Sequence, residues 1–334
     1  MNESNSDTTI KDIRIVTKKF PLTKPYNLSF TILYHFISIQ ALVSFSDGRK
    51  TIAEVVPLLG YNDESEDIII KNLTDWTKKI VGLPINDARI YIQKNIKSFP
   101  FSTTALLTAI DLYKFPIQEL NHDALQYVIP TSTVKIEELK ELLTNPNHTI
   151  KVKLTGNVQK DIFGLEQVRN ELESYSKKIR FDANQAYTVE DTEILCEYLS
   201  INQYGNIVEY IEQPLPVGME NELGYLREKY NTINFMLDES IVKKGDLDLA
   251  IKNDILFIKL KLFKQGGINE VISIAELAHK KNIRVILGNG VATRISNYIE
   301  NQIYNYHDHL FEYPLESNGF KKLRRQLNPI LKVK

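Results

Sequence analysis

Five short charged motifs follow one another in the second half of the chain, each at the end of a predicted strand. In order they are Lys151-Val-Lys153, Arg180-Phe-Asp182-Ala-Asn184, Glu212-Gln-Pro214, Asp238-Glu-Ser240 and Lys259-Leu-Lys261, the last followed by Gly266-Gly267. If these strands belong to a (β/α) barrel, their C-terminal ends meet at one mouth. Three acids between two lysine pairs are the groups needed to bind a divalent cation and to move a proton beside a carboxylate.

The three acids are candidate metal ligands. Asp182, Glu212 and Asp238 each end an apolar run and precede a loop. Carboxylate oxygens are hard ligands that suit Mg²⁺, whereas histidine or cysteine at zinc-like spacing is absent from the sequence. We therefore predict that these three residues bind Mg²⁺.

The lysines are candidate proton carriers. Lys153 and Lys261 lie on strands on either side of the acids, so they are expected to face each other across the mouth. Lys151 and Lys259 each stand two residues earlier and share the same strand face. A lysine accepts a proton only when it is neutral, and a nearby cation such as Lys151 or a metal would lower its pKa toward neutrality.

Each motif has a structural alternative when taken alone. An acid at a strand end is usually a helix cap, a Lys-x-Lys pair is usually a solvated edge, and Gly266-Gly267 is a turn. The order lysine, acid, acid, acid, lysine on successive strands favours an active site. The alternative of another class is a barrel that binds a carboxylate metabolite without catalysis.

The elements that must position these residues follow two patterns. Strands are predicted over residues 127–130, 150–154, 179–182, 208–212, 233–238, 255–262, 284–287 and 309–313, with amphipathic helices between them. Such alternation favours a parallel, closed barrel. Earlier in the chain, strands over residues 13–20, 31–45 and 51–58, with a turn at Asp47-Gly48, precede helices over 67–81, 88–96 and 102–113. This part is predicted to be an α+β domain.

Composition narrows the protein's class. The 334 residues are 43% hydrophobic and 25% charged, as in a soluble globular protein. Lys and Arg number 41 against 42 acids, so neither nucleic acid nor a membrane is an expected partner. The polar residues 1–12 lack the apolar core of a signal peptide, and the single cysteine, Cys196, cannot form an internal disulfide. A cytoplasmic location is therefore expected.

Taken together, the five motifs resemble the enolase superfamily, specifically its muconate lactonizing enzyme subgroup, most strongly over residues 150–290. The resemblance implies a (β/α)₇β TIM-like barrel (residues 126–314) beneath an N-terminal α+β capping domain (residues 1–125) that the tail, residues 315–334, completes. It also implies a homo-oligomer with one Mg²⁺ per subunit, and two cap loops, about residues 22–30 and 58–64, that close over the substrate. The implied roles are metal ligation by Asp182, Glu212 and Asp238, acid/base catalysis by Lys153 and Lys261, and support from Lys151, Asn184, Glu239 and Lys259.

In this family, substrate specificity is expected to depend on residues of the seventh and eighth strands. Dipeptide epimerases of the subgroup usually carry an Asp-x-Asp pair on the eighth strand that holds the substrate ammonium. The corresponding stretch here, HDHLFEYPLE, offers Glu312 or Asp308 but no such pair, and Ala292 stands where many relatives carry a glutamate. We predict that Glu312 and Asn289 contact substrate.

The resemblance implies a Mg²⁺-dependent racemase or epimerase that acts on a small-molecule carboxylate, a dipeptide or an N-acyl amino acid, through an enediolate intermediate. The alternatives are o-succinylbenzoate synthase, which is a dehydratase, and a muconate-type cycloisomerase. The same five charged residues would serve all three reactions, so the core motifs do not separate them.

Overall fold

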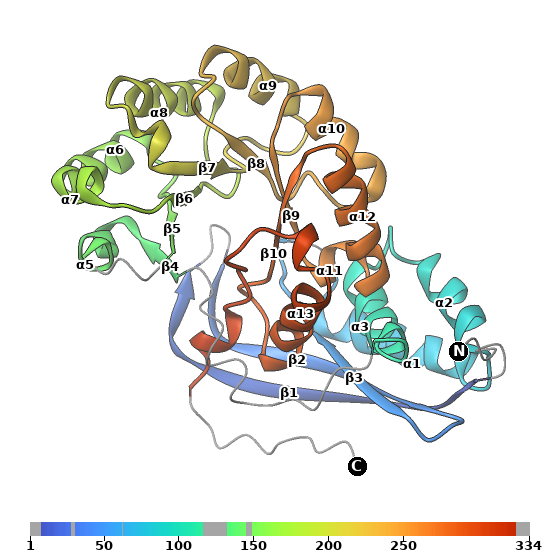
Figure 1. Ribbon diagram of the computed structural model, residues 1–334. Coiled ribbons are helices and arrows are strands. Elements are labelled where there is room, and N and C mark those ends of the chain that lie inside the picture. Colours follow the sequence, from blue (N-terminus) through green and yellow to red (C-terminus); the bar gives the residue numbers. More distant parts are fainter. Residues whose placement is uncertain (1–7, 28–30, 62, 116–131, 145–148, 325–334) are drawn as a thin grey trace.

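The computed structural model describes residues 8–27, 31–61, 63–115, 132–144 and 149–324 (Figure 1). The strands are β1 (Ile10–Asn27), β2 (Ile32–Phe45), β3 (Lys50–Val55), β4 (Ser132–Lys135), β5 (Ile150–Lys153), β6 (Ile179–Asp182), β7 (Val208–Glu212), β8 (Phe235–Leu237), β9 (Phe257–Leu260) and β10 (Arg284–Leu287). The helices are α1 (Glu66–Ile80), α2 (Ile85–Gln93), α3 (Pro100–Asp111), α5 (Leu139–Leu143), α6 (Val158–Glu166), α7 (Arg169–Ser174), α8 (Val189–Ile201), α9 (Glu220–Lys229), α10 (Leu247–Lys252), α11 (Leu262–Gln265), α12 (Ile268–Lys280) and α13 (Arg294–Tyr306). Short 3₁₀ helices are η1 (Ile136–Glu138), η2 (Tyr204–Asn206), η3 (Lys244–Asp246), η4 (Asp308–Leu310) and η5 (Gly319–Lys322).

The N-terminal part is an antiparallel sheet in the order β1-β2-β3, with α1, α2 and α3 beside it (Figure 1). Gly48, at a φ of 90°, makes the predicted turn between β2 and β3, where a left-handed backbone favours glycine. Helix α3 is buried on all sides between the sheet and the barrel, because residues 101–110 are apolar or small and Asp111 is paired with Arg89 (2.7 Å). The predicted α+β arrangement is confirmed.

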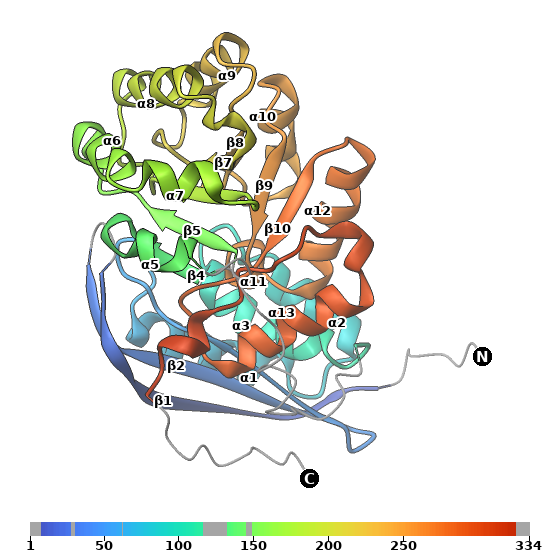
Figure 2. The same cartoon turned by 60° about the vertical axis from the view of Figure 1, so that its left-hand side comes forward.

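Strands β4 to β10 form a parallel sheet in sequence order, curled with helices on its outer side (Figures 1 and 2). The register places Lys153 of β5 opposite Asp182 of β6, and Asp182 opposite Glu212 of β7. These charged residues therefore stand at one level, at the C-terminal edge of the sheet. The predicted barrel is confirmed.

The eighth strand differs from the sequence prediction. Its predicted span, residues 309–313, begins in η4, where Leu310 is buried in a helical turn rather than extended in the wall. The chain joins the wall from Glu312 onward: the Glu312 and Glu316 backbone amides donate to the carbonyls of Val285 (2.8 Å) and Leu287 (3.0 Å). The side-chain amide of Asn318 donates to Thr133 Oγ1 of β4 (3.2 Å). The wall is thus closed by residues 312–318. The predicted first strand, residues 127–130, lies outside the described residues.

The N-terminal sheet and the barrel also share a tight boundary. Leu323 bridges Leu22 of β1 in antiparallel fashion, and the Arg324 amide donates to the Pro21 carbonyl (3.0 Å). The predicted division into residues 1–125, 126–314 and 315–334 stays a prediction, since its first boundary falls outside the described residues. Within the part of the chain described, no helix combines the length and apolar character needed to span a membrane.

Candidate active site

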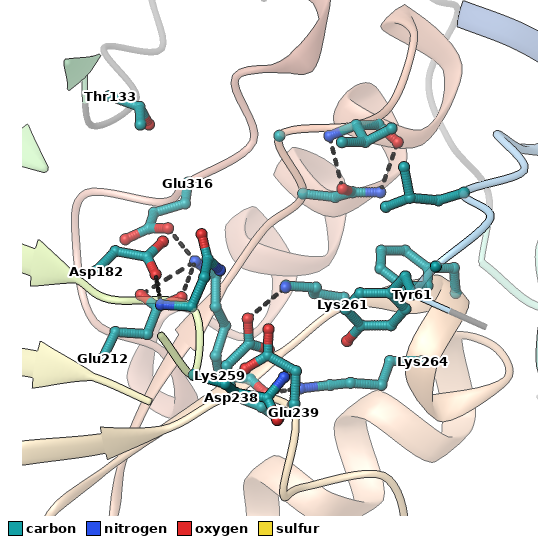
Figure 3. A pocket seen from close by; sticks show the side chains of 18 of the residues that line it. Tyr61, Thr133, Asp182, Glu212, Asp238, Glu239, Lys259, Lys261, Lys264 and Glu316 are labelled. Carbon is teal, nitrogen blue, oxygen red and sulfur yellow. Dashed lines mark hydrogen bonds and ion pairs between the residues drawn. The ribbon is translucent and has the colours of Figure 1, made fainter. Parts of the chain in front are cut away.

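A cavity of about 440 Å³ opens at the C-terminal end of the barrel strands. Tyr26, Leu58 and Tyr61 close it from the N-terminal part, so both predicted cap loops supply lining residues. Asp182, Glu212, Asp238, Glu239, Glu316, Lys151, Lys153, Lys259, Lys261 and Lys264 are its charged lining residues. The strand-end residues predicted from sequence are therefore brought together (Figure 3).

Lys151 joins the carboxylates on three parts of the wall. Its Nζ lies 2.8 Å from Asp182 Oδ2, 2.6 Å from Glu212 Oε2 and 2.9 Å from Glu316 Oε2. Burial alone would lower the pKa of Lys151, but these carboxylates raise it well above its usual range. Lys259 contacts Glu212 Oε1 (3.2 Å) and Glu316, so both supporting lysines are buried in a network of opposite charges.

The two predicted acid/base lysines each hold a carboxylate. Lys153 donates to Asp182 and to Asn184, and Lys261 donates to Asp238 beside the ring of Tyr61 (Figure 3). Although burial opposes it, the carboxylates raise the pKa of both lysines, well above the usual value for Lys261. Both side chains are therefore ammonium groups in this state.

Lys264 was not predicted from sequence. From α11, its Nζ reaches Asp238 Oδ1 (2.7 Å), the Asp238 carbonyl and the Lys259 carbonyl (2.8 Å). It is buried, and it links the backbone at Asp238, which follows β8, to the backbone of Lys259 on β9. Its only sequence signal is its place three residues after Lys261, one turn of helix onward.

Glu239 lies beside the third acid. Burial, together with the neighbouring charge of Asp238, raises the pKa of Glu239 to about 7. Its Oε2 is buried and finds no hydrogen-bond partner among the described residues. A buried oxygen of this kind is available to a ligand in the cavity.

The loops after the acids are held by the residues that follow each acid. Gln213 accepts from the Asp238 amide (2.9 Å) and donates to Ser240 Oγ (2.9 Å), which ties the second and third motifs together. The Asn184 amide donates to Asp182 Oδ1 (3.1 Å) with Asn184 at a φ of 47°. The motifs thus contain both the candidate ligands and the groups that orient them.

The donor set fits a hard divalent cation in its chemistry. Asp182, Glu212 and Asp238 are each 1% exposed and supply carboxylate oxygens from three adjacent strands. The Lys151 ammonium already holds a positive charge between Asp182 and Glu212. Lysine side chains lie between the carboxylates. In the described chain, no three carboxylate, histidine or cysteine groups converge on one ion position. The ligand assignment stays a prediction.

The structure separates the two predicted substrate contacts. Asn289 lines the cavity, where its side chain also bonds the Val291 amide (2.8 Å) and carbonyl (3.1 Å). Glu312 is not brought to the mouth. It pairs with Arg284, the first residue of β10, at 2.6 Å and therefore lies at the opposite end of the barrel. Since the wall segment begins later than predicted, the acid that reaches the mouth is Glu316.

Comparison with known proteins agrees with this geometry. Residues 136–321 match the family described as enolase C-terminal domain-like, which is more than half of the chain. The chain belongs to this family and thus to the enolase superfamily.

The relatives that match most of the chain are isomerases. A hydrophobic dipeptide epimerase of Enterococcus faecalis is 25% identical over 295 residues, which are 84% of this chain and 82% of the relative. An N-succinyl-L-Arg/Lys racemase of Bacillus cereus is 22% identical over 311 residues, covering 86% and 82%. The predicted enzyme class, an isomerase of this superfamily, is confirmed.

Solved structures share the fold over nearly the whole chain. A dipeptide epimerase of Methylococcus capsulatus, complexed with Mg and the dipeptide L-Arg-D-Lys, has a TM-score of 0.78 and 23% identity over 96% of this chain and 93% of its own. The N-succinyl Arg/Lys racemase structure from Bacillus cereus has a TM-score of 0.80 and 20% identity, covering 96% and 89%.

Proposed function

We propose that this protein is a Mg²⁺-dependent racemase or epimerase of a dipeptide or N-acyl amino acid, which inverts the carbon alpha to a carboxylate. The observation that carries the proposal is the placement of Lys153 at the end of β5 and Lys261 directly after β9. The candidate metal ligands lie on the three strands between them. A carbon held beside those ligands would have one lysine on each face.

The candidate ligands Asp182, Glu212 and Asp238 would hold Mg²⁺, which when bound stabilises negative charge on the oxygens of the substrate carboxylate. Loss of the alpha proton places that charge there, as an enediolate. Lys151 and Lys259 add fixed positive charge behind Glu212. The wall is therefore suited to stabilising an anionic intermediate.

The lysines carry the proton. Both are ion-paired ammonium groups in this state, so one must leave its carboxylate and lose a proton before it can act as a base. The other remains an acid and returns a proton to the opposite face of the carbon. Because the two lysines can exchange roles, the reaction can run in both directions.

The N-terminal part and Phe263 of α11 supply an apolar cover. Leu58, Tyr61, Phe101 and Phe263 line the cavity on the side of Lys261. The rings of Phe101 and Phe263 stack at 4.9 Å, and Tyr61 meets Phe263 edge-on at 5.4 Å. These groups would exclude water from the carbon that exchanges its proton.

Solvent deuterium incorporation tests the proposal. The Mg²⁺-loaded protein would be incubated in D₂O with dipeptides, N-acyl amino acids and the o-succinylbenzoate precursor, and products followed by NMR and mass spectrometry. Deuterium at an alpha carbon with inversion is expected. Loss of water from the precursor, without alpha exchange elsewhere, would instead assign a dehydratase. Exchange that continues unchanged in Lys153→Ala and Lys261→Ala would contradict the role of both lysines.

A further inference from the structure

One corner of the cavity lies across the mouth from the candidate metal ligands. We name it the distal corner and define it by the lining residues Tyr26, Thr133, Gly290 and Asn318, together with Lys322 of η5, which packs behind Gly290 and Asn318. Its lining residues come from the first, seventh and eighth wall segments and from β1, whereas the three acids lie on the third, fourth and fifth. The two sets therefore face each other.

Lys322 is the charged group of this corner. Its Nζ donates to the Gly290 carbonyl (2.9 Å) and to Asn318 Oδ1 (3.1 Å), and it lies 4.5 Å from the centre of the Tyr26 ring. A Cβ built on Gly290 would stand 3.4 Å from that Nζ. Since Gly290 lines the cavity, the absence of a side chain there leaves the ammonium group close to the cavity surface.

Among the described residues, no carboxylate pairs with the positive charge of Lys322. All its hydrogen-bond partners are neutral oxygens, and it forms no ion pair with any residue that the structure describes. Burial lowers the pKa of Lys322, as expected for a cation that has lost water without gaining a carboxylate. An anion bound at this corner would compensate the Lys322 ammonium for its lost hydration.

Glu316, the nearest acid on this wall, is already neutralised. It contacts Lys151 and Lys259, and Arg180 lies 3.7 Å away. Although burial opposes it, these cations hold the pKa of Glu316 well below its usual range. A substrate ammonium would have to displace two buried lysines to use this carboxylate. The corner is therefore poorly suited to a free amine.

The overall charge of the cavity lining also favours an anion over a free amine at this corner. Its lining contains five carboxylates and five lysines, so these charges balance before Lys322 or a divalent cation is counted. A substrate with its carboxylate at the acids and its alpha carbon between Lys153 and Lys261 must send one substituent across the mouth. That substituent ends at the distal corner.

We propose that the distal corner binds a second carboxylate of the substrate through Lys322, and that it does not bind a free ammonium group. This inference rests on the proposed function, because it assumes which end of the substrate meets the three acids. The second carboxylate could belong to an N-acyl group or to the amino-acid side chain. Both sources share the chemistry that Lys322 would recognise.

Calorimetric titration of the Mg²⁺-loaded protein tests the inference with ligands that share one reacting end. N-succinylglycine, N-acetylglycine and glycylglycine present an anionic, a neutral and a cationic distal group. N-succinylglycine should bind about tenfold more tightly than N-acetylglycine, because it adds one buried ion pair, and glycylglycine should bind most weakly. Tightest binding by glycylglycine, or no measurable binding of N-succinylglycine, overturns the inference.

Variants assign the effect to Lys322. Lys322→Met should remove most of the tenfold preference while leaving N-acetylglycine within about twofold, and Lys322→Arg should retain the preference. Lys321→Met is the matched control, since Lys321 is the exposed neighbour on η5. An equal weakening of all three ligands by Lys322→Met would show a purely structural role and reject the inference.

Two further comparisons complete the test. N-acetylglutamate against N-acetylglutamine asks whether a side-chain carboxylate serves as well as an acyl one. Deuterium exchange on the same ligands separates this inference from the proposed function. The expected order of binding without any exchange would reject the reaction alone, whereas exchange with the order reversed would reject the distal corner alone.

Discussion

Two sets of buried carboxylates, one at the barrel mouth and one at the boundary between the N-terminal part and the barrel, are satisfied by different partners. At the barrel mouth, Asp182, Glu212 and Asp238 contact lysine ammonium groups. At the boundary between the N-terminal part and the barrel, Glu54 and Glu64 contact neutral donors. Burial alone therefore does not distinguish a catalytic acid from a structural one.

The boundary acids stabilise helix starts. Glu54 of β3 accepts from the Thr293 amide (2.9 Å), Thr293 Oγ1 (2.7 Å) and the Ser296 amide (3.2 Å), at the beginning of α13. Glu64 accepts from the Phe101 amide (2.6 Å) and the Ser102 amide (3.0 Å), at the beginning of α3. These donors are fixed in backbone and complement the helix dipole.

Two of the mouth acids, Asp182 and Asp238, also have partners that can move, Lys153 and Lys261. A lysine ammonium stands on a flexible four-carbon chain and can leave, rotate or lose a proton, whereas a backbone amide cannot. The contrast indicates that the mouth is built for exchange of charge and the boundary for fixed attachment. Substitutions on each side should therefore affect different quantities.

The largest expected effect is on turnover. Lys261→Ala removes one of the two proton carriers, so alpha-proton exchange should fall by roughly 10²–10⁴-fold. Mg²⁺ affinity and unfolding free energy should change little, as titration calorimetry and urea unfolding would show. Lys280→Ala, an exposed lysine at the far end of α12, is the control. Full turnover by Lys261→Ala would contradict its assigned role.

The next largest effect is expected on Mg²⁺ affinity. Asp238→Asn removes one ligand charge, and Mg²⁺ affinity measured by titration calorimetry should fall by about 100-fold. Lys261 and Lys264 would also lose their carboxylate partner. Unchanged Mg²⁺ affinity would refute the claim that Asp238 is a ligand. Glu239→Gln, at the neighbouring acid, should weaken Mg²⁺ binding less than Asp238→Asn does.

On the boundary side the expected loss is in stability. Glu54→Gln replaces one acceptor oxygen by a donor that faces amide groups, so unfolding free energy should drop by about 1–3 kcal/mol. Urea unfolding measures it, with the exposed Glu222→Gln on α9 as control. Exchange per folded molecule should stay within about twofold. A loss of turnover without a loss of stability would show that the boundary takes part in catalysis.

Much of the mouth could be predicted from sequence because strand ends coincide with changes from apolar to charged residues. The predicted spans 179–182, 208–212 and 284–287 match β6, β7 and β10. Strands β8 and β9 are shorter than predicted, since Ile233 and Ile255 are buried without joining the ladder. The pattern of apolar residues in the sequence predicts which residues are buried, and buried residues continue beyond the ends of the hydrogen-bonded strand.

The missed residues depend on contacts between distant segments. Glu316 and Lys322 follow the predicted barrel in sequence, and the closure of the wall by residues 312–318 brings Glu316 to the mouth and Lys322 behind Gly290 and Asn318. Lys264 reaches Asp238 from a short helix that the apolar pattern does not mark. Conversely, the apolar residues before Glu312 predicted a strand that the structure places later. Pattern alone does not give the register of a closing segment.

Glu300 of α13 is a buried acid whose protonation should change near neutral pH, and stability should change with it. Burial raises the pKa of Glu300 to about 7, although Ser317 and Asn297 donate to Oε2. A raised folded-state pKa gives stability that is full below about pH 4.5 and is lost as the pH rises through 7. Between pH 5 and 8, Glu300→Gln should therefore gain about 1–3 kcal/mol relative to the native protein. Urea unfolding at both pH values measures the difference, and a constant difference would contradict the raised pKa.

The smallest effect is expected at Glu312, which sequence placed at the substrate and the structure places at the barrel base. Its pair with Arg284 spans 2.6 Å, but the side chains are 32% and 42% exposed, so solvent screens the attraction. Glu312→Gln should lower unfolding free energy by no more than about 1 kcal/mol and leave deuterium exchange within about twofold. Glu316→Gln is the matched comparison. It removes the partner of two buried lysines at the mouth, so it should reduce exchange and stability together. If Glu312→Gln abolished exchange while Glu316→Gln did not, the eighth segment would pass the mouth in the register that the sequence predicted.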